Sequence, residues 1–186
     1  MASIEQKIDR LRERICSSDF LQNKGLGNEV GIHIFNYPAK DEIVVMAGIE
    51  KLKKDSTLPC RIIDKDLYEL LLTLLEEKHV LDKISPMEEK KDKSYILAQI
   101  EKIASAPIVA SKLNYSPHVP GKDVLFITGV GKVYPFVRAH QVLNALQKYF
   151  TDIPAVMFYP GTYNGQDLSL FDICEPNNYY RAFRMI

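Results

Sequence analysis

The sequence predicts an α/β fold, with a mostly parallel central sheet of four strands and helices on both faces. Apolar runs typical of buried strands alternate along the 186 residues with segments whose apolar residues recur every three or four positions. Strands that alternate with helices need crossover connections, which make the sheet parallel and cover both of its faces. With 46% hydrophobic residues, the chain has enough material for a single α/β domain over residues 1–186.

The first part of the chain predicts two helices around a short strand. Residues 1–18 are expected to form an N-terminal helix, because Ser3 and Gln6 make a capping pair ahead of apolar residues at helical spacing. A β-like run follows at residues 32–35. Residues 41–54 predict a second helix, with lysines near its end, where the helix dipole favours cations.

The middle of the chain predicts a strand and further helices. Residues 59–64 have the composition of a strand, and Asp66 then begins a helix with a wide leucine stripe. Another helix start is expected at Ser85, and the isoleucine stripe that follows it ends at Pro107. Residues 111–121 are predicted to be a loop.

Residues 122–186, the C-terminal third, predict two more strands and a tail. Residues 123–128 are the clearest strand, and a helix is expected to begin at Pro135. A fourth strand is predicted at residues 154–159. The tail is expected to be a hairpin or a short helical turn, with hairpin strands at residues 168–173 and 180–185 or the turn at residues 179–184.

Charge and cysteine usage argue against several classes of protein. Lys plus Arg and Asp plus Glu number 24 each, so the basic surplus of a dedicated nucleic-acid binder is missing and any contact with nucleic acid is expected to be indirect. The three cysteines, Cys16, Cys60 and Cys174, predict free thiols in a reducing cytosol, without a disulfide framework or a zinc site. We see no signal peptide and no apolar run near the roughly 20 residues of a membrane span, so a cytoplasmic protein is expected.

A glycine-containing loop after a strand is one candidate for phosphate binding. Gly129, Gly131 and Lys132 follow residues 123–128, a place where backbone N–H groups and a helix N-terminus can hold an anion. The loop is shorter than a Walker A loop, and Val133 stands where its Ser or Thr would be. A tight β–α turn explains the glycines better, and a nucleotide- or nucleic-acid-binding regulatory module is kept as the alternative function.

No catalytic or metal-binding constellation can be assembled from the sequence. The four histidines never pair with one another at the four-residue spacing of helical metal ligands, and no G-x-S-x-G elbow is present. Asp64 and Asp66 follow a strand, at the sheet edge where α/β sites lie, but a helix cap is the preferred interpretation of Asp66. We therefore predict that the protein is not an enzyme and holds no metal and no cofactor.

Aromatic side chains interleaved with arginines are the most unusual feature of the C-terminal third. Tyr and Arg are over-represented at the energetic centres of protein interfaces, although aromatics alternating with Arg can also stack single-stranded bases. Core packing accounts for most of the phenylalanines and less well for the Tyr-Tyr-Arg run. The candidates for protein binding are Tyr134, Arg138, His140, Tyr163, Tyr179, Tyr180, Arg181 and Arg184.

Four separated blocks of residues have the pattern of a known family. They are Gly25–Glu29 with His33–Pro38, then GVGKVYPFVRAH at 129–140, FYPGTYNGQDLSLF at 158–171 and NYYRAF at 178–183. These blocks resemble the BrxB family of bacterial BREX phage-resistance systems. The resemblance implies a non-enzymatic component that associates with other BREX proteins. These include the alkaline-phosphatase-like protein PglZ, the DNA methyltransferase and a large ATPase.

An adaptor of the BREX complex is the function that these observations favour. Such an adaptor would present its C-terminal third to a partner, with PglZ as the leading candidate and the methyltransferase and ATPase as further ones. The resemblance also makes the polar residues in the matching blocks, Asp167 among them, candidates for that contact.

Overall fold

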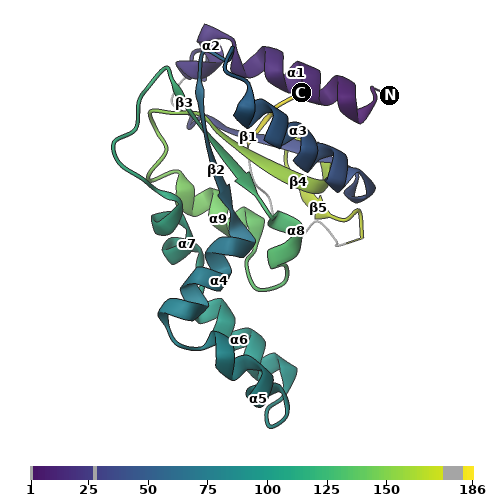
Figure 1. The fold of residues 1–186 in the computed structure, drawn as a ribbon, viewed down its shortest axis with the longest axis vertical. Helices are drawn as coiled ribbons and strands as arrows, with labels where there is room; N and C mark the ends of the chain where they lie inside the picture. The colour runs from purple at the N-terminus through teal and green to yellow at the C-terminus, as the bar shows by residue number, and fades with distance from the viewer. Residues whose placement is uncertain (1, 27–28, 174–181) are drawn as a thin grey trace.

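A six-stranded sheet, parallel except for one strand, runs through the centre of the protein (Figure 1). The computed structural model describes residues 2–26, 29–173 and 182–186. The strands are β1 (Ile32–Tyr37), β2 (Arg61–Asp66), β3 (Asp123–Thr128), β4 (Ala155–Tyr163), β5 (Leu168–Leu170) and β6 (Phe183–Arg184).

The strands lie in the order β2-β3-β4-β1-β6, and all neighbours in this series are parallel. β5 pairs antiparallel with the end of β4. The predicted fold class, α/β with a mostly parallel sheet and helices on both faces, is therefore confirmed. The four strands predicted from the sequence are β1 to β4, and β6 adds a strand beside β1.

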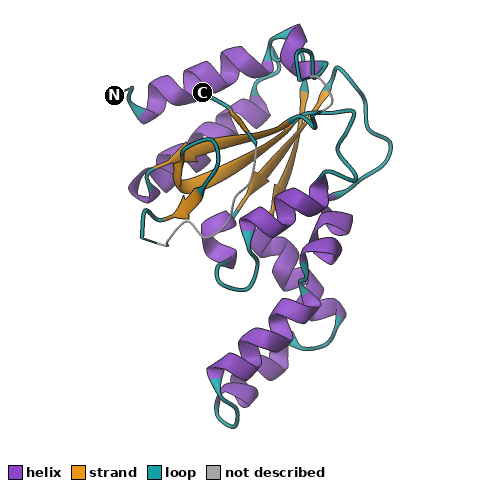
Figure 2. Cartoon of the chain, turned by 180° about the vertical axis from the view of Figure 1, so that it is seen from behind, coloured by secondary structure: helices purple, strands orange, loops and turns teal. Residues whose placement is uncertain are grey.

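The helices connect the strands and cover the sheet (Figure 2). In the described part of the chain, none of them combines the length with the apolar composition that a membrane crossing requires. The helices are α1 (Ile4–Ile15), α2 (Ser18–Leu21), α3 (Glu42–Lys54), α4 (Leu67–Glu77), α5 (Ile84–Glu88), α6 (Lys93–Ile103), α7 (Ala106–Leu113), α8 (Val130–Val133) and α9 (Ala139–Leu146), with the 3-10 turns η1 (Ala39–Asp41) and η2 (Leu81–Lys83).

Two hydrophobic cores lie on the two faces of the sheet. α1 and α3 enclose one core, which contains Val124 and Phe126 of β3. α4, α7 and α9 enclose the other, which contains Leu125 and Ile127 of the same strand. Successive residues of a strand point to opposite faces, so the unbroken apolar run of β3 is buried throughout because both faces are covered. α5 and α6 extend away from the sheet as a helical arm (Figure 1).

Helix starts are confirmed where the sequence supplies a capping side chain. Ser3 and Gln6 exchange side-chain and backbone hydrogen bonds of 3.0 and 3.3 Å, which is the predicted capping box of α1. Asp66 accepts hydrogen bonds from the first turn of α4, as expected of an N-cap residue.

Three helix boundaries around prolines differ from the prediction. The helix expected to begin at Pro135 begins at Ala139 instead, after an extended N-cap residue, Arg138. Pro107 does not end a helix but stands in the first turn of α7, where its missing N–H costs nothing, so the predicted loop at residues 111–121 is helical up to Leu113. α5 begins at Ile84 and not after Ser85.

The tail does not form the predicted hairpin between residues 168–173 and 180–185. β5 pairs with β4, which continues through Pro160 and Gly161 to Tyr163, beyond its predicted end at residue 159. β6 pairs in parallel with β1. The segment between the two predicted hairpin strands and most of the alternative helical turn at 179–184 lie outside the described residues.

Candidate interaction surface at the carboxyl edge of the sheet

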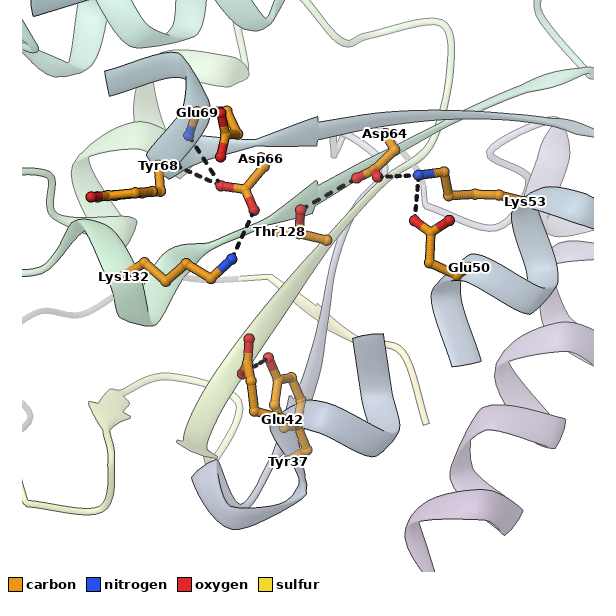
Figure 3. Close-up of polar contacts among 10 residues, drawn as sticks. All are labelled: Tyr37, Glu42, Glu50, Lys53, Asp64, Asp66, Tyr68, Glu69, Thr128 and Lys132. Atoms are coloured by element: carbon orange, nitrogen blue, oxygen red, sulfur yellow. Dashed lines mark hydrogen bonds and ion pairs between the residues drawn. The ribbon is translucent and has the colours of Figure 1, made fainter. Parts of the chain in front are cut away.

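The four central strands end along one edge of the sheet (Figure 3). Tyr37 at the end of β1 stands opposite Pro160 of β4, and Asp66 at the end of β2 stands opposite Thr128 of β3. Each strand is parallel to its neighbour, so the segments that follow them all start at this edge. In α/β proteins this is the edge at which binding sites form.

Asp66 joins the end of β2 to two helices. Its Oδ1 accepts hydrogen bonds from the backbone N–H groups of Tyr68 at 2.7 Å and Glu69 at 3.3 Å. Its Oδ2 lies 3.4 Å from Nζ of Lys132 on α8 (Figure 3). The carboxylate is thus used as a helix cap and as an anchor for the loop after β3.

A second carboxylate at the edge, Asp64, is also paired within the chain. Lys53 Nζ donates to Asp64 Oδ2 at 2.8 Å and to Glu50 Oε1 at 2.6 Å, and Thr128 donates to Asp64 Oδ1 at 3.3 Å. The hydrogen bond to Asp64, with that to Glu50, raises the pKa of Lys53 above its usual value. Asp64 and Glu50 thus share the charge of Lys53, so both carboxylates are paired within the chain.

The end of β1 is tied to the helix that follows it. The hydroxyl of Tyr37 donates a 2.7 Å hydrogen bond to Glu42 Oε2 at the start of α3 (Figure 3). The Tyr37 side chain is buried, and burial, together with this hydrogen bond, raises its pKa. The contact holds the first turn of α3 at the carboxyl edge.

Exposed hydrophobic side chains gather where the chain leaves this edge. Nine large hydrophobic residues are exposed in the described part of the chain. Four of them follow β1, β2 or β3, whose carboxyl ends lie at this edge, and two follow the antiparallel β5, where the ring of Phe171 lies close to Gly131 in the segment after β3. Ile43 and Ile173 are 83% and 84% exposed, far more than a residue of their type usually is. We name the six the carboxyl-edge surface; they are Ile43, Val44, Tyr68, Tyr134, Phe171 and Ile173.

An apolar groove continues this surface along the helical arm. It has a volume of about 400 Å³, begins at Tyr68 and runs between α4 and α6. Pro135 and Phe136, next to Tyr134, form part of its wall. Large exposed apolar areas on a soluble domain mark contacts with other molecules.

The predicted phosphate loop is filled by the protein's own side chains. Gly129 has a φ of +74°, and a Cβ there would run into the Asp66 carboxylate. A Cβ at Gly131 would lie 3.0 Å from the ring of Phe171. With a carboxylate against Gly129 and paired with Lys132, the loop disfavours an anion. The geometry supports the tight turn that the sequence favoured.

We expect Gly129→Ala to destabilise the protein by about 2 kcal/mol, because it combines a left-handed backbone with the contact to Asp66. Gly121→Ala is the matched control, since Gly121 also has a φ of +74° but nothing within 4 Å of its Cβ position. Urea denaturation of both variants measures the difference. Equal losses in the two variants would show that the Asp66 contact contributes nothing.

Three of the predicted binding residues lie close together around the start of α9. Tyr134 is partly exposed, and the Arg138 guanidinium lies 5.2 Å from its ring centroid, which is a cation–π contact. His140 is half-buried, and burial, followed by the charge of Arg138, lowers the pKa of its imidazole. Arg138 and His140 also line a cavity of about 680 Å³ between the starts of α7 and α9.

Two other predicted residues hold the C-terminal segment in place. Tyr163 is buried, and its hydroxyl donates to the carbonyl of Ala182 at 2.7 Å and accepts from its N–H at 2.8 Å. Arg184 donates to the backbone carbonyl of Tyr163 at 2.7 Å. These contacts indicate a structural role for both. Tyr179, Tyr180 and Arg181 lie outside the described residues.

Comparison with known proteins identifies the family. The family described as BREX protein BrxB matches residues 63–185. The chain belongs to the BrxB family. It is 42% identical over 194 residues to a BREX protein BrxB of Bacillus cereus (strain H3081.97), covering 100% of this chain and 99% of the relative. It is 30% identical over 187 residues to a BREX protein BrxB of Escherichia coli O9:H4 (strain HS), covering 98% and 92%.

The resemblance inferred from the sequence blocks is thereby confirmed. The part of this BrxB-family chain that matches, residues 63–185, begins in β2 and includes the ends of β2, β3 and β4. It therefore contains four of the six residues of the carboxyl-edge surface. In residues 2–26, 29–173 and 182–186 of this chain, no three His, Cys, Asp or Glu side chains gather in the way a metal site requires.

The exposed isoleucines of this BrxB-family protein, Ile43 and Ile173, were not predicted from the sequence. Ile43 lies two positions before Val45, which places it on the face of α3 opposite to the buried stripe of Val45, Ile49 and Leu52. The signal that could have identified Ile43 was its position as an apolar residue outside the buried stripe of its helix. Phe171 and Ile173 carried no such signal, because they follow a three-residue strand and have no helical or strand period.

Proposed function

We propose that this protein is a non-catalytic adaptor of a BREX anti-phage defence system, and that it binds PglZ through the carboxyl-edge surface. The family membership supports a place among the BREX proteins. The observation that carries the choice of surface is that four of the nine exposed large hydrophobic residues follow strands that end at one edge of the sheet, with Phe171 beside the segment after β3.

The chemistry of this edge suits a protein partner. The buried centres of protein interfaces are rich in aromatic and aliphatic side chains and poor in charge. The edge offers exposed aromatic residues, Tyr68, Tyr134 and Phe171, and exposed isoleucines, and the carboxylates of Asp64 and Asp66 are paired within the chain. A nucleic acid would need unpaired cations instead.

The polar groups at the edge support an adaptor more than an enzyme. Asp66 caps a helix, and Asp64 accepts hydrogen bonds from a lysine and a threonine, so both carboxylates have structural roles at the end of β2. The methyltransferase and the ATPase are further candidate partners. We propose that the chain acts in the cytosol as one α/β domain and contacts nucleic acid only through them.

Co-purification of the tagged protein with PglZ, co-expressed from the same operon, tests the proposal. We expect PglZ to be recovered at both low and high salt, because burial of apolar surface is not screened by ions. Recovery of nucleic acid alone, lost at high salt, or recovery of no BREX protein would contradict the adaptor function.

A further inference from the structure

The cavity between the starts of α7 and α9 has the size of a binding site for a small molecule. Its volume is about 680 Å³, which is within the range of ligand pockets. α7 and α9 lie side by side, and the end of α6 forms another part of the wall (Figure 1). All the lining residues lie in the part of the chain that the structure describes, and none of them belongs to the carboxyl-edge surface.

An arginine in this cavity has its donors free for a ligand. Arg138 is exposed, and its guanidinium lies 5.2 Å from the centroid of the Tyr134 ring. The guanidinium makes no hydrogen bond and no ion pair with any described residue. A cation–π contact uses none of its five N–H donors, and this planar group pairs with phosphate in a bidentate geometry.

A histidine and a serine add neutral donors to the same cavity. His140 is half-buried, and burial, followed by the charge of Arg138, lowers the pKa of the imidazole. The ring is therefore neutral near pH 7 and offers one N–H donor. Ser105 is the N-cap residue of α7, but its side chain makes no capping hydrogen bond, so its hydroxyl is free to turn toward a ligand.

The backbone around these side chains also favours an anion. α7 and α9 both begin at the cavity, and neither is capped by a side chain, so side chains do not occupy the N–H groups of their first turns. The first turn of a helix carries a partial positive charge. The backbone thus adds to the charge of Arg138.

The remaining lining residues suit an organic group attached to that anion. Most of them are apolar and form a wall beside the polar side chains. One carboxylate, Glu101 on α6, also lines the cavity, and it can accept a hydrogen bond from a hydroxyl of the organic group. The apolar residues are Ala104, Ala106, Pro107, Phe136 and Val137.

We infer that this cavity binds a small phosphate monoester, with the phosphoryl group on Arg138 and His140 and the organic part against Phe136. A phosphate monoester carries a charge of about −1.5 to −2 at pH 7 and three strong acceptor oxygens. It therefore matches a cation that stands among several neutral donors. The inference goes beyond the adaptor function, because it uses no residue of the carboxyl-edge surface.

Isothermal titration calorimetry of the full chain tests the inference with phenyl phosphate, AMP, inorganic phosphate, phenol and adenosine. We expect at least one monoester to bind about tenfold more tightly than both inorganic phosphate and its own parent alcohol, because only the monoester uses the donors and the wall together. Equal binding of inorganic phosphate would overturn the role of the wall. Failure of both monoesters to bind at millimolar concentration would overturn the inference as a whole.

Two variants test the placement of the phosphoryl group. Arg138→Gln removes the cation at an exposed position and should weaken the monoester by about tenfold, without changing the binding of the parent alcohol. Gln141→Glu adds a like charge to the cavity in the first turn of α9, where the helix dipole tolerates it, and should also weaken the monoester.

Lys102→Gln is the matched control, because Lys102 is an exposed cation next to Glu101 on α6 and does not line the cavity. It should bind the monoester as the wild type does. Thermal unfolding of the three variants checks that each of them is folded. Wild-type affinity in both Arg138→Gln and Gln141→Glu, or an equal loss in Lys102→Gln, would overturn the placement of the phosphoryl group.

Discussion

Ile43→Asp is expected to weaken PglZ binding by roughly thirtyfold or more, about 2 kcal/mol, which is the loss typical of a central interface residue. Ile43 is 83% exposed on the carboxyl-edge surface, so the partner would cover it. A carboxylate at this position would be buried on binding without a partner, and the cost of removing it from water would oppose the complex. Affinity measured by surface plasmon resonance or calorimetry with purified PglZ gives the result directly.

The same substitution should leave the fold intact. Ile43 lies in the first turn of α3, where the helix dipole favours a negative charge. Ile108→Asp is the matched control, because Ile108 is also an exposed isoleucine, 38% exposed, in the first turn of a helix, and it does not belong to the carboxyl-edge surface. If both variants lose PglZ equally, or if Ile43→Asp binds as wild type, the binding surface is elsewhere.

Asp123→Ala is expected to destabilise the protein by about 3 kcal/mol, the largest effect on stability that we predict. Asp123 is fully buried at the start of β3, with an exposed fraction of 0%. Its carboxylate accepts two hydrogen bonds from Arg61, at 2.9 and 2.8 Å, one from Tyr115 at 2.9 Å and one from the N–H of Val119 at 3.0 Å. Removing it leaves these donors without their acceptor.

Urea denaturation of Asp123→Ala measures this loss, and Glu77→Ala is the control. Glu77 pairs with Lys112 at 2.7 Å, but both side chains are nearly half exposed, so its loss should change the free energy of unfolding by less than about 1 kcal/mol. Similar losses of unfolding free energy in the two variants would mean that the buried position of Asp123 does not strengthen its hydrogen bonds.

Asp123 also predicts how stability depends on pH. Burial raises the pKa of this carboxyl, but the hydrogen bonds from Arg61, Tyr115 and Val119 outweigh burial and lower the pKa below its usual value. The folded state therefore binds the proton less readily than the unfolded chain, and the stabilisation is present above about pH 4 and is lost as the pH falls through the folded pKa. As the pH falls, Asp123→Asn should lose less stability than the wild-type protein.

Local signals in the sequence were sufficient for most of the elements of this fold. The apolar run at residues 123–128 predicted β3 with its observed bounds, and the Ser3–Gln6 pair predicted the start of α1. These signals act within a few residues, through hydrogen bonds to a helix end or through the alternation of side chains along a strand. Because these local signals determine the order of strands and helices, they were also sufficient to predict the α/β class.

The strand partners and the candidate surface depend on contacts between residues far apart in the chain. β1 pairs with β4, where Ile32 stands opposite Ala155, and no pattern near either strand specifies the other. The tail strands likewise joined β4 and β1 instead of each other, because each fills an unpaired edge of hydrogen-bonding groups. Segments as distant as Ile43 and Tyr134 reach one edge only because parallel strands bring their carboxyl ends together. Local chemistry thus determined which elements form, and the packing of the sheet determined which side chains remain exposed together.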